Sequence, residues 1–395
     1  MARYLIRQTL LSLIKLLVFL TFMFFFIQVM MPGDFVDQFS LLMDASQREE
    51  LRVQLGLDLP ILQRYVHWMG QLIHLDLGQS LTGQPIVEML KQVIPPTLLV
   101  FLTGTILAFL TGLWLGKTTA WRHSSWLSRL TTLGGITLYT SFPPWLAWLV
   151  IYLLAGGVGF EIMGEVGGLR GVSFQGLSNE IWRATEIHPS VIAFRMVLTG
   201  LAVTVVFLFI SALVKRFTGF RIPGLLLLLL VAAGTVGLWY LLKMDVLAFD
   251  IAQLAWQPIL IYLLLSFGET MIIMQSSMTD VMKEEYINTA RAKGLSETIV
   301  REKHAARNAL LPVLSRLVIS LPYLLTGVVI IESAVAWPGM GTNMWNALYW
   351  QNMPVVMATL LIVGLISLLA RLILDVATAY LDPRIRFDQK SPSAV

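Results

Sequence analysis

"EEYINTARAKGLSETIVREKHAARNALLPVL", residues 284 to 314, is the most polar long stretch of a 395-residue chain in which 56% of the residues are hydrophobic. Only 13% of the residues are charged, against about 25% in ordinary soluble domains. This composition predicts an integral membrane protein, with the polar stretch outside the lipid. The formal charge of +4 comes from basic residues scattered among apolar segments, which argues against nucleic-acid binding.

Apolar stretches long enough to cross a bilayer lie on both sides of this segment. About twenty residues of α-helix span the hydrocarbon core and satisfy every backbone polar group internally. The sequence predicts eight such helices, so the expected fold class is an all-α polytopic bundle with a small extracytoplasmic helical region. They lie near residues 8–31, 95–116, 129–155, 191–214, 222–242, 257–276, 311–334 and 355–380.

The distribution of basic residues predicts the orientation of these helices, because Lys and Arg near the ends of spans resist translocation. With the N-terminus inside, the cytoplasmic segments contain most of the 28 Lys and Arg residues. Both termini and the loop 277–310 are therefore expected in the cytoplasm, and residues 32–94 outside.

The outer segment 32–94 contains signals for two short helices. Ser46 and Glu49 have capping-box spacing and are expected to start the first helix, which Gly56 is placed to end. The second is expected after Pro60, where apolar residues recur at helical spacing. Both helices are expected to pack on the spans or on a partner.

The polar stretch itself is predicted to form a helix, a glycine turn and a second helix. Thr279 is placed to cap the first helix, Gly294 to end it and Ser296 to start the second. An ordinary charged loop and a docking helix that inserts into a groove on a soluble partner both fit this pattern. The small residues Ala290 and Ala292 favour docking, because they permit close backbone approach.

The form "EYINTARAKGLS…HAARNALLPVL" resembles the cytoplasmic coupling loop of ABC importer permeases, and especially the dipeptide/oligopeptide/nickel branch. In the general loop signature a Glu-Ala-Ala triplet precedes a glycine by four residues. Here Asn288, Thr289 and Ala290 occupy the triplet and Gly294 the glycine. Five other segments resemble the same branch in the same order: "MPGD" (31–34), "GLDLPILQRYVHWM" (56–69), "LDLGQSLTGQPI" (75–86), "ESAVAWPGMG" (332–341) and "YLDPRIR" (380–386).

The resemblance implies a permease subunit that forms half of a transmembrane pathway and hydrolyses nothing itself. No Walker-type G-x-x-x-x-G-K-[ST] sequence occurs in the chain, so ATP and Mg are expected on partner ATPase subunits and no cofactor on this chain. The implied partners are a homologous second permease subunit, two cytoplasmic ATPase subunits, an extracytoplasmic substrate-binding protein and membrane lipid. The implied location is a bacterial or archaeal cytoplasmic (inner) membrane. The implied cargo is di- or oligopeptides, with nickel and oligosaccharides as alternatives.

Residues 156–256 depart from the family pattern, because they have room for two additional spans where the family usually has a shorter external loop. We expect a six-span core with a peripheral hairpin inserted at 191–242. The expected organisation is an N-terminal cytoplasmic segment and first span (1–31), an extracytoplasmic helical region (32–94), spans 2 and 3 (95–155), an outer loop with the inserted hairpin (156–256), the permease core with its coupling loop 277–310 (257–386) and a cytoplasmic tail (387–395).

The candidate site residues form three groups, for each of which a solvated or packing role is the alternative. The coupling-loop candidates are Asp280, Glu285, Tyr286, Ala290, Arg291, Lys293 and Gly294. The candidates for an outer gate or pathway are Glu332, Trp337, Pro338 and Gly339, where a helix break with an interfacial tryptophan is the alternative. The intramembrane carboxylates are Glu269 and Asp375, with Arg195, Arg316 and Arg371 as candidate counter-ions.

Two other function classes compete with the permease interpretation. An ion-coupled secondary transporter would favour internal repeats and midplane carboxylates; no repeat is obvious, and Glu269 and Asp375 are the residues that would serve. A membrane-embedded enzyme would need clustered His, Asp or Glu, or a serine beside a base, and the sequence shows no such cluster. With no Cys and no ligand spacing among five His, neither a catalytic nor a metal site is predicted.

Overall fold

The computed structural model describes residues 2–30, 33–122, 125–153, 182, 187–220 and 222–381. These residues form helices and turns, with an isolated β-bridge between Gln79 and Pro85. The helices are α1 (Ala2–Met30), η1 (Phe35–Phe39), α2 (Ala45–Gln54), α3 (Ile61–Ile73), α4 (Ile86–Trp121), α5 (Trp126–Tyr139), α6 (Pro143–Ile151), α9 (Pro189–Thr218), α10 (Gly224–Leu241), α11 (Asp245–Val281), α12 (Glu285–Ala292), α13 (Glu297–Ile299), η5 (Val300–Ala305), α14 (Ala306–Val335), α15 (Met340–Tyr349) and α16 (Met353–Leu381).

Helices occupy each of the eight stretches predicted to cross the membrane. Within the described part of the chain, α1, α4, α9 and α11 are long and apolar enough to do so by length and composition. Shorter apolar helices lie at Leu226–Leu241 and Met353–Leu369. The predicted all-α polytopic bundle is confirmed, and the number of spans stays a prediction.

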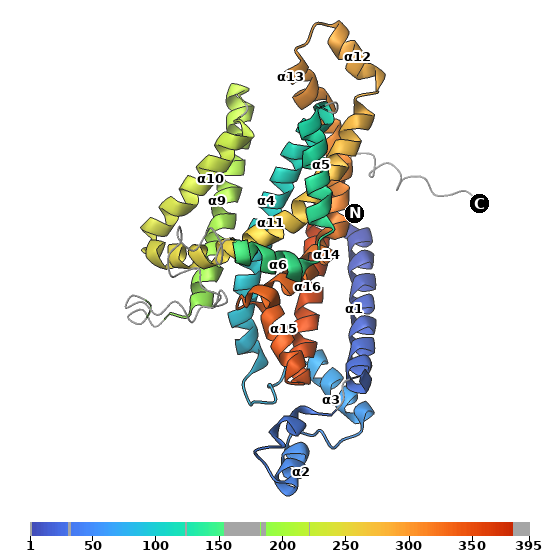
Figure 1. Cartoon of the computed structure of the whole chain (residues 1–395), viewed down its shortest axis with the longest axis vertical. Helices are drawn as coiled ribbons and strands as arrows, with labels where there is room; N and C mark the ends of the chain where they lie inside the picture. The colour runs from blue at the N-terminus through green and yellow to red at the C-terminus, as the bar shows by residue number, and fades with distance from the viewer. Residues whose placement is uncertain are drawn as a thin grey trace, which may run out of the picture.

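The two polar regions lie at opposite ends of the bundle. Figure 1 shows α12 and α13 at its upper end and α2 and α3 at its lower end, with α4, α11 and α14 running between. This arrangement agrees with the assignment of the loop 277–310 and the segment 32–94 to opposite sides of the membrane.

Small residues allow α4 and α11 to pack closely at the centre of the bundle. Gly104, Ala108, Gly112 and Gly116 recur every fourth residue of α4 and face α11. A Cβ added at Gly112 would lie 2.7 Å from the carbonyl oxygen of Phe267. Such stripes let transmembrane helices approach to backbone contact, where van der Waals packing holds them together.

The stretch 129–155, predicted as one span, is divided between two helices. α5 ends at Tyr139, Phe142 is extended, and Pro143 begins α6. The residue before a proline is disfavoured in the α-helical conformation, which explains the break. Figure 1 shows α5 along the bundle and α6 lying across it.

The hairpin of α9 and α10 is only partly peripheral. Ile192, Ala193, Met196 and Val197 of α9 are buried in the same hydrophobic cluster as residues of α4, α6 and α11. The described side chains of α10 are all at least partly exposed. The expectation of a peripheral addition was therefore wrong for α9, whose N-terminal half is part of the core.

Both helices expected in the segment 32–94 exist, as α2 and α3. The capping box of α2 is made by Asp44 and Gln47, so the expected pair Ser46 and Glu49 was wrong by two residues. Gly56, with φ +66°, ends the α2 segment as predicted. Its left-handed conformation costs glycine little, because glycine has no Cβ.

α3 packs on α1 through its aromatic side chains. The Tyr65 hydroxyl lies 2.9 Å from the Thr21 hydroxyl, and the Trp68 ring stacks on Phe24 at 5.5 Å between centroids. Because aromatic pairs add packing energy beyond the area they bury, this contact fixes α3 against the C-terminal half of α1.

Candidate functional site

The first helix of the coupling loop 277–310 begins later than the sequence predicted. This loop and the helices in it, through the first turn of α14, are called the coupling segment below. α11 continues to Val281, and α12 starts at Glu285. Thr279 therefore lies inside α11, where its hydroxyl donates to the carbonyl oxygen of Gln275 at 2.8 Å. Met278 of the same turn is fully buried, and this apolar contact explains why α11 extends beyond the predicted start at Thr279.

The predicted glycine turn is present. Gly294 has φ +75° and its N–H donates to the carbonyl oxygen of Arg291 at 2.9 Å. Ser296 then precedes α13 as its N-cap residue. The left-handed residue ends α12 and lets the chain reverse toward the bundle.

α12 is held on the bundle by its inward face. Ile287 is fully buried and Ala290 is 4% exposed, and both belong to a cluster with Met274 and Met278 of α11. Ala290, expected at the partner's groove, is therefore occupied inside this chain. Sequence analysis missed Ile287, although its spacing of three from Ala290 marks one helix face.

The outward face of α12 carries exposed polar residues. Glu285 is exposed, and Tyr286 is 38% exposed with its hydroxyl 2.7 Å from the donating Asn308 side-chain amide. Lys293 is exposed and, within the described part of the chain, has no ion pair. Asp280 and Lys283 form an exposed pair at 3.5 Å, which contributes little free energy to folding.

Arg291, one of the coupling-loop candidates, contacts residues of its own chain. Its Nε donates to the Glu297 carboxylate at 3.1 Å. Its guanidinium carbon lies 5.7 Å from the ring centroid of Trp121, at the end of α4. A cation at this distance over an indole face is attracted by the ring, so Arg291 links α12 to α4.

A second link between α4 and the coupling segment runs through Glu302 of η5. Its carboxylate accepts from Lys117 Nζ at 2.8 Å and from Arg301 Nε at 3.0 Å. Burial alone would raise the pKa of Glu302, but these two hydrogen-bonded cations outweigh burial and hold that pKa below its ordinary range. No local sequence pattern predicts this pair, because Lys117 and Glu302 lie 185 residues apart.

At the opposite end of the bundle, Glu332 and Gly339 are brought together. Glu332 is fully buried, and its Oε2 accepts from the backbone N–H of Gly341 at 2.7 Å. A Cβ added at Gly339 would lie 2.3 Å from Glu332 Oε1. The carboxylate therefore closes the turn between α14 and α15 against its glycines.

The same turn buries Trp337. The chain reverses at Ala336, which has φ +56°, and Trp337 follows with its side chain fully buried, while Pro338 is partly exposed. The N–H of Met340 donates to the Thr97 hydroxyl of α4 at 2.8 Å. The helix break expected in the alternative interpretation is present, with Trp337 packed inside the chain; the role of this segment as an outer gate stays a prediction.

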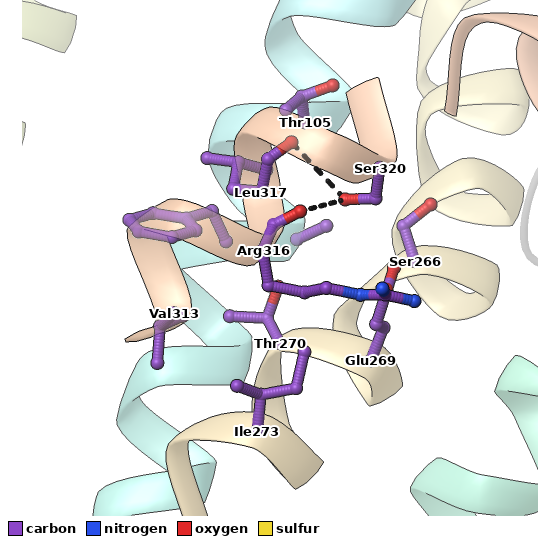
Figure 2. Close-up of a pocket in the computed structure, with 11 residues that line it drawn as sticks. Thr105, Ser266, Glu269, Thr270, Ile273, Val313, Arg316, Leu317 and Ser320 are labelled. Atoms are coloured by element: carbon purple, nitrogen blue, oxygen red, sulfur yellow. Dashed lines mark hydrogen bonds and ion pairs between the residues drawn. The ribbon is translucent and has the colours of Figure 1, made fainter. Parts of the chain in front are cut away.

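An ion pair joins α11 to α14. Figure 2 shows the Arg316 side chain extending across to Glu269, whose Oε1 accepts from Arg316 Nε at 2.9 Å. The Glu269 side chain is 13% exposed and that of Arg316 52%. Among the candidate counter-ions whose side chains the structure describes, Arg195 and Arg316, only Arg316 contacts Glu269. Pairing with Arg316 lowers the cost of placing the Glu269 charge among apolar helices.

Small polar side chains surround this pair, together with apolar ones. The cavity there has a volume of about 10 Å³, which is near the volume that one water occupies. Its polar lining comes from Thr105, Ser266, Thr270 and Ser320 (Figure 2). Ser320 donates to the backbone of its own helix at 3.1 Å. In this conformation the cavity beside Glu269 and Arg316 is too small to hold a transported molecule.

Several predictions lie wholly or partly outside the described residues. The backbone of Asp375 and Arg371 belongs to α16, but their side chains lie outside the described part of the structure. Arg195 is exposed on α9. Residues 154–181 and 183–186 of the outer loop and the tail 387–395 are outside the described residues. Within the described part, no group of three or more His, Asp or Glu could hold a metal ion.

Two family models match this chain, and known permeases align with nearly all of it. A family described as "Binding-protein-dependent transport system inner membrane component" matches residues 108–387, and one described as the N-terminal membrane component of such systems matches residues 1–85. The oligopeptide transport system permease protein AppB of Bacillus subtilis is 28% identical, over 98% of this chain and 100% of its own length. With the same coverage, the dipeptide transport system permease protein DppB of Alkalihalophilus pseudofirmus is 28% identical and the glutathione transport system permease protein GsiC of Escherichia coli O6:H1 is 26% identical. The chain thus belongs to the family of binding-protein-dependent transport system inner membrane components, the multi-pass permease subunits of ABC importers.

Proposed function

We propose that this permease subunit imports di- or oligopeptides and forms half of a transmembrane pathway with a homologous second permease subunit. The oligopeptide, dipeptide and glutathione permeases that match nearly the whole chain support this cargo class. An extracytoplasmic substrate-binding protein delivers the cargo and sets most of the selectivity. Family membership favours ATP-driven import over the ion-coupled alternative.

The observation that carries the coupling mechanism is the position of α12. It stands at one end of the bundle, with one face buried on α11 and the other exposed (Figure 1). Two ATPase subunits bind ATP and Mg, and one of them receives the exposed face of α12, with Tyr286 as an anchor and Glu285 and Lys293 at the rim. ATP-driven closure of the ATPases then moves the coupling loop 277–310.

The buried face of α12 transmits this movement to the spans. Ile287 and Ala290 contact the end of α11, and the contacts of Arg291 with Trp121 and of Glu302 with Lys117 join the segment to α4. Displacement of α12 therefore moves α4 and α11 together, since these two helices pack at backbone distance. Rocking of this unit opens the pathway alternately to the two sides.

At the outer end, the Glu332 and Trp337 turn acts as the rigid base of the gate. Its support is the burial of both side chains and the hydrogen bond from Met340 to Thr97. We assign this end and α2 and α3 to the extracytoplasmic side of a bacterial or archaeal inner membrane, and both termini to the cytoplasm.

The coupling role is tested by purifying the chain from its native membranes and identifying bound proteins by mass spectrometry. Replacing 285–292 by a neutral linker of equal length is expected to remove the ATPase subunits. The matched control replaces 45–54, an exposed helix of similar length at the other end, and is expected to retain them. Retention of the ATPases without α12 contradicts the proposal.

The cargo class is tested in cells that lack the chain and are complemented with it. Uptake of radiolabelled di- and oligopeptides is expected to depend on the chain, and uptake of nickel and of oligosaccharides is not. Chain-dependent uptake of nickel or oligosaccharides without peptide uptake overturns the peptide assignment while leaving the coupling mechanism intact.

A further inference from the structure

A groove of about 1330 Å³ opens beside the coupling segment, between α4, the α9–α10 hairpin and the start of α14. Its apolar walls include Leu110, Leu113 and Trp114 of α4 and Leu228 of α10. Trp114 is 62% exposed and Leu110 is 41% exposed. The groove therefore presents apolar side chains of α4 and α10 to an open space between these helices.

Positive charge lines the groove where it reaches the coupling segment. Lys215 lies in the last turn of α9, Lys303 in η5 and Arg307 in the first turn of α14. Within the described part of the chain these three have no ion pairs. Lys117 and Glu302 also line the groove but neutralise each other at 2.8 Å. Three uncompensated cations thus stand beside apolar walls.

We propose that this groove binds an anionic phospholipid. The acyl chains lie along α4 and α10, and the phosphate lies among Lys215, Lys303 and Arg307. Charge complementarity supports this occupant, because basic pockets between transmembrane helices suit anionic headgroups. Inorganic phosphate would leave the apolar walls uncovered, and an acidic loop of a soluble protein would not reach side chains of the spans. A phospholipid supplies both an anionic group for the cations and acyl chains for the apolar walls.

The site depends on the hairpin that departs from the family pattern. α9 supplies one cation and α10 one wall, whereas Lys303 and Arg307 follow α13 in the coupling segment. A lipid bound here joins the hairpin to the segment that moves during transport. The proposal does not rest on peptide import; the orientation proposed above only assigns the lipid to the cytoplasmic leaflet.

Native mass spectrometry of the intact complex tests the headgroup contacts. The double variant Lys215→Gln/Arg307→Gln is compared with Arg122→Gln/Arg129→Gln, which removes two exposed cations near the same end but outside the groove. Each basic residue near an anionic headgroup is worth about 1 kcal/mol, so phosphatidylglycerol retention is expected to fall roughly tenfold or more in the groove variant alone. Equal loss in both variants, or no loss in either, overturns the proposal.

Two further measurements avoid dependence on the variants. Phosphatidylethanolamine is expected to bind the wild-type complex more weakly than phosphatidylglycerol, and equal retention of the two lipids overturns the charge assignment. Photoactivatable phosphatidylglycerol in vesicles is expected to label residues 110–117 and 224–228 of the wild-type chain, without displacement by inorganic phosphate. Labelling confined to other helices, or displacement by phosphate, overturns the lipid site. None of these readouts requires ATPase activity or a cargo, so they fail independently of the proposed function.

Discussion

The conformation of single residues decides the turn after α12. Gly294 has φ +75°, and a Cβ added there would meet no atom within 4 Å. The cost of substitution is therefore backbone strain alone, about 1–2 kcal/mol for an ordinary residue in the left-handed region. At Gly339, by contrast, the cost of substitution comes from steric overlap, because an added Cβ would meet the Glu332 carboxylate.

Gly294→Val is expected to lower cargo-stimulated ATPase activity severalfold, because a β-branched residue shifts the turn and with it the exposed face of α12. Gly294→Asn is the matched control and is expected to retain activity, since Asn tolerates this conformation. Activity is measured on the complex in proteoliposomes with its binding protein. Full activity of the Val variant would show that the turn is not needed.

Gly339→Ala is expected to lower the thermal stability of the chain, because the new Cβ would lie 2.3 Å from Oε1 of the fully buried Glu332 side chain. Gly200→Ala in α9 is the control. A Cβ at that position meets nothing within 4 Å, and alanine is favoured over glycine in a helix by up to about 1 kcal/mol. Thermal unfolding in detergent checks both, and an unchanged midpoint for Gly339→Ala contradicts the close contact.

At the scale of elements, the pairing of α4 with α11 organises the bundle. The two helices meet along a line of small residues, and both continue to the contacts that hold α12 and η5. Because their surfaces meet at backbone distance, relative sliding is opposed by steric overlap as well as by lost contacts. The pair is therefore suited to move as one body.

Gly112→Val is expected to destabilise the chain more strongly than Gly339→Ala, since its larger side chain would overlap both the Phe267 carbonyl and the Thr270 side chain. Gly134→Val on α5 is the matched control, with nothing within 4 Å of an added Cβ. Both valine substitutions put the same β-branched residue in a helix. Fluorescence-detected size-exclusion chromatography after heating measures the difference, and equal melting of the two valine variants would exclude tight packing of α4 on α11.

At the scale of the whole molecule, the two polar ends should lie on opposite sides of the membrane. The chain contains no Cys, so single cysteines report on one position each. Lys293→Cys and Glu50→Cys are both at exposed positions. A membrane-impermeant maleimide is expected to label Glu50→Cys in intact spheroplasts and Lys293→Cys only in inside-out vesicles. Labelling of both from one side contradicts the orientation.

Local signals predicted the existence of elements better than their ends. Hydropathy located the helices, because about twenty apolar residues have no stable place except a span. It placed the start of the second span near residue 95, whereas α4 begins at Ile86 and carries Pro95 and Pro96 inside it. Ile86 is fully buried and Leu90 nearly so. Packing of these two side chains stabilises helix before Pro95, so α4 begins earlier than the predicted span.

The sequence by itself determined the membrane class, the two polar ends and the turn at Gly294, since composition, hydropathy and glycine conformations depend on neighbouring residues. Only the tertiary structure decided which face of α12 is buried, that Arg316 pairs with Glu269, and that Lys117 reaches Glu302. These contacts join residues far apart in the chain, so their distances follow from how the helices pack. The groove beside the hairpin arises in the same way, from residues of separate elements that meet only in the folded bundle.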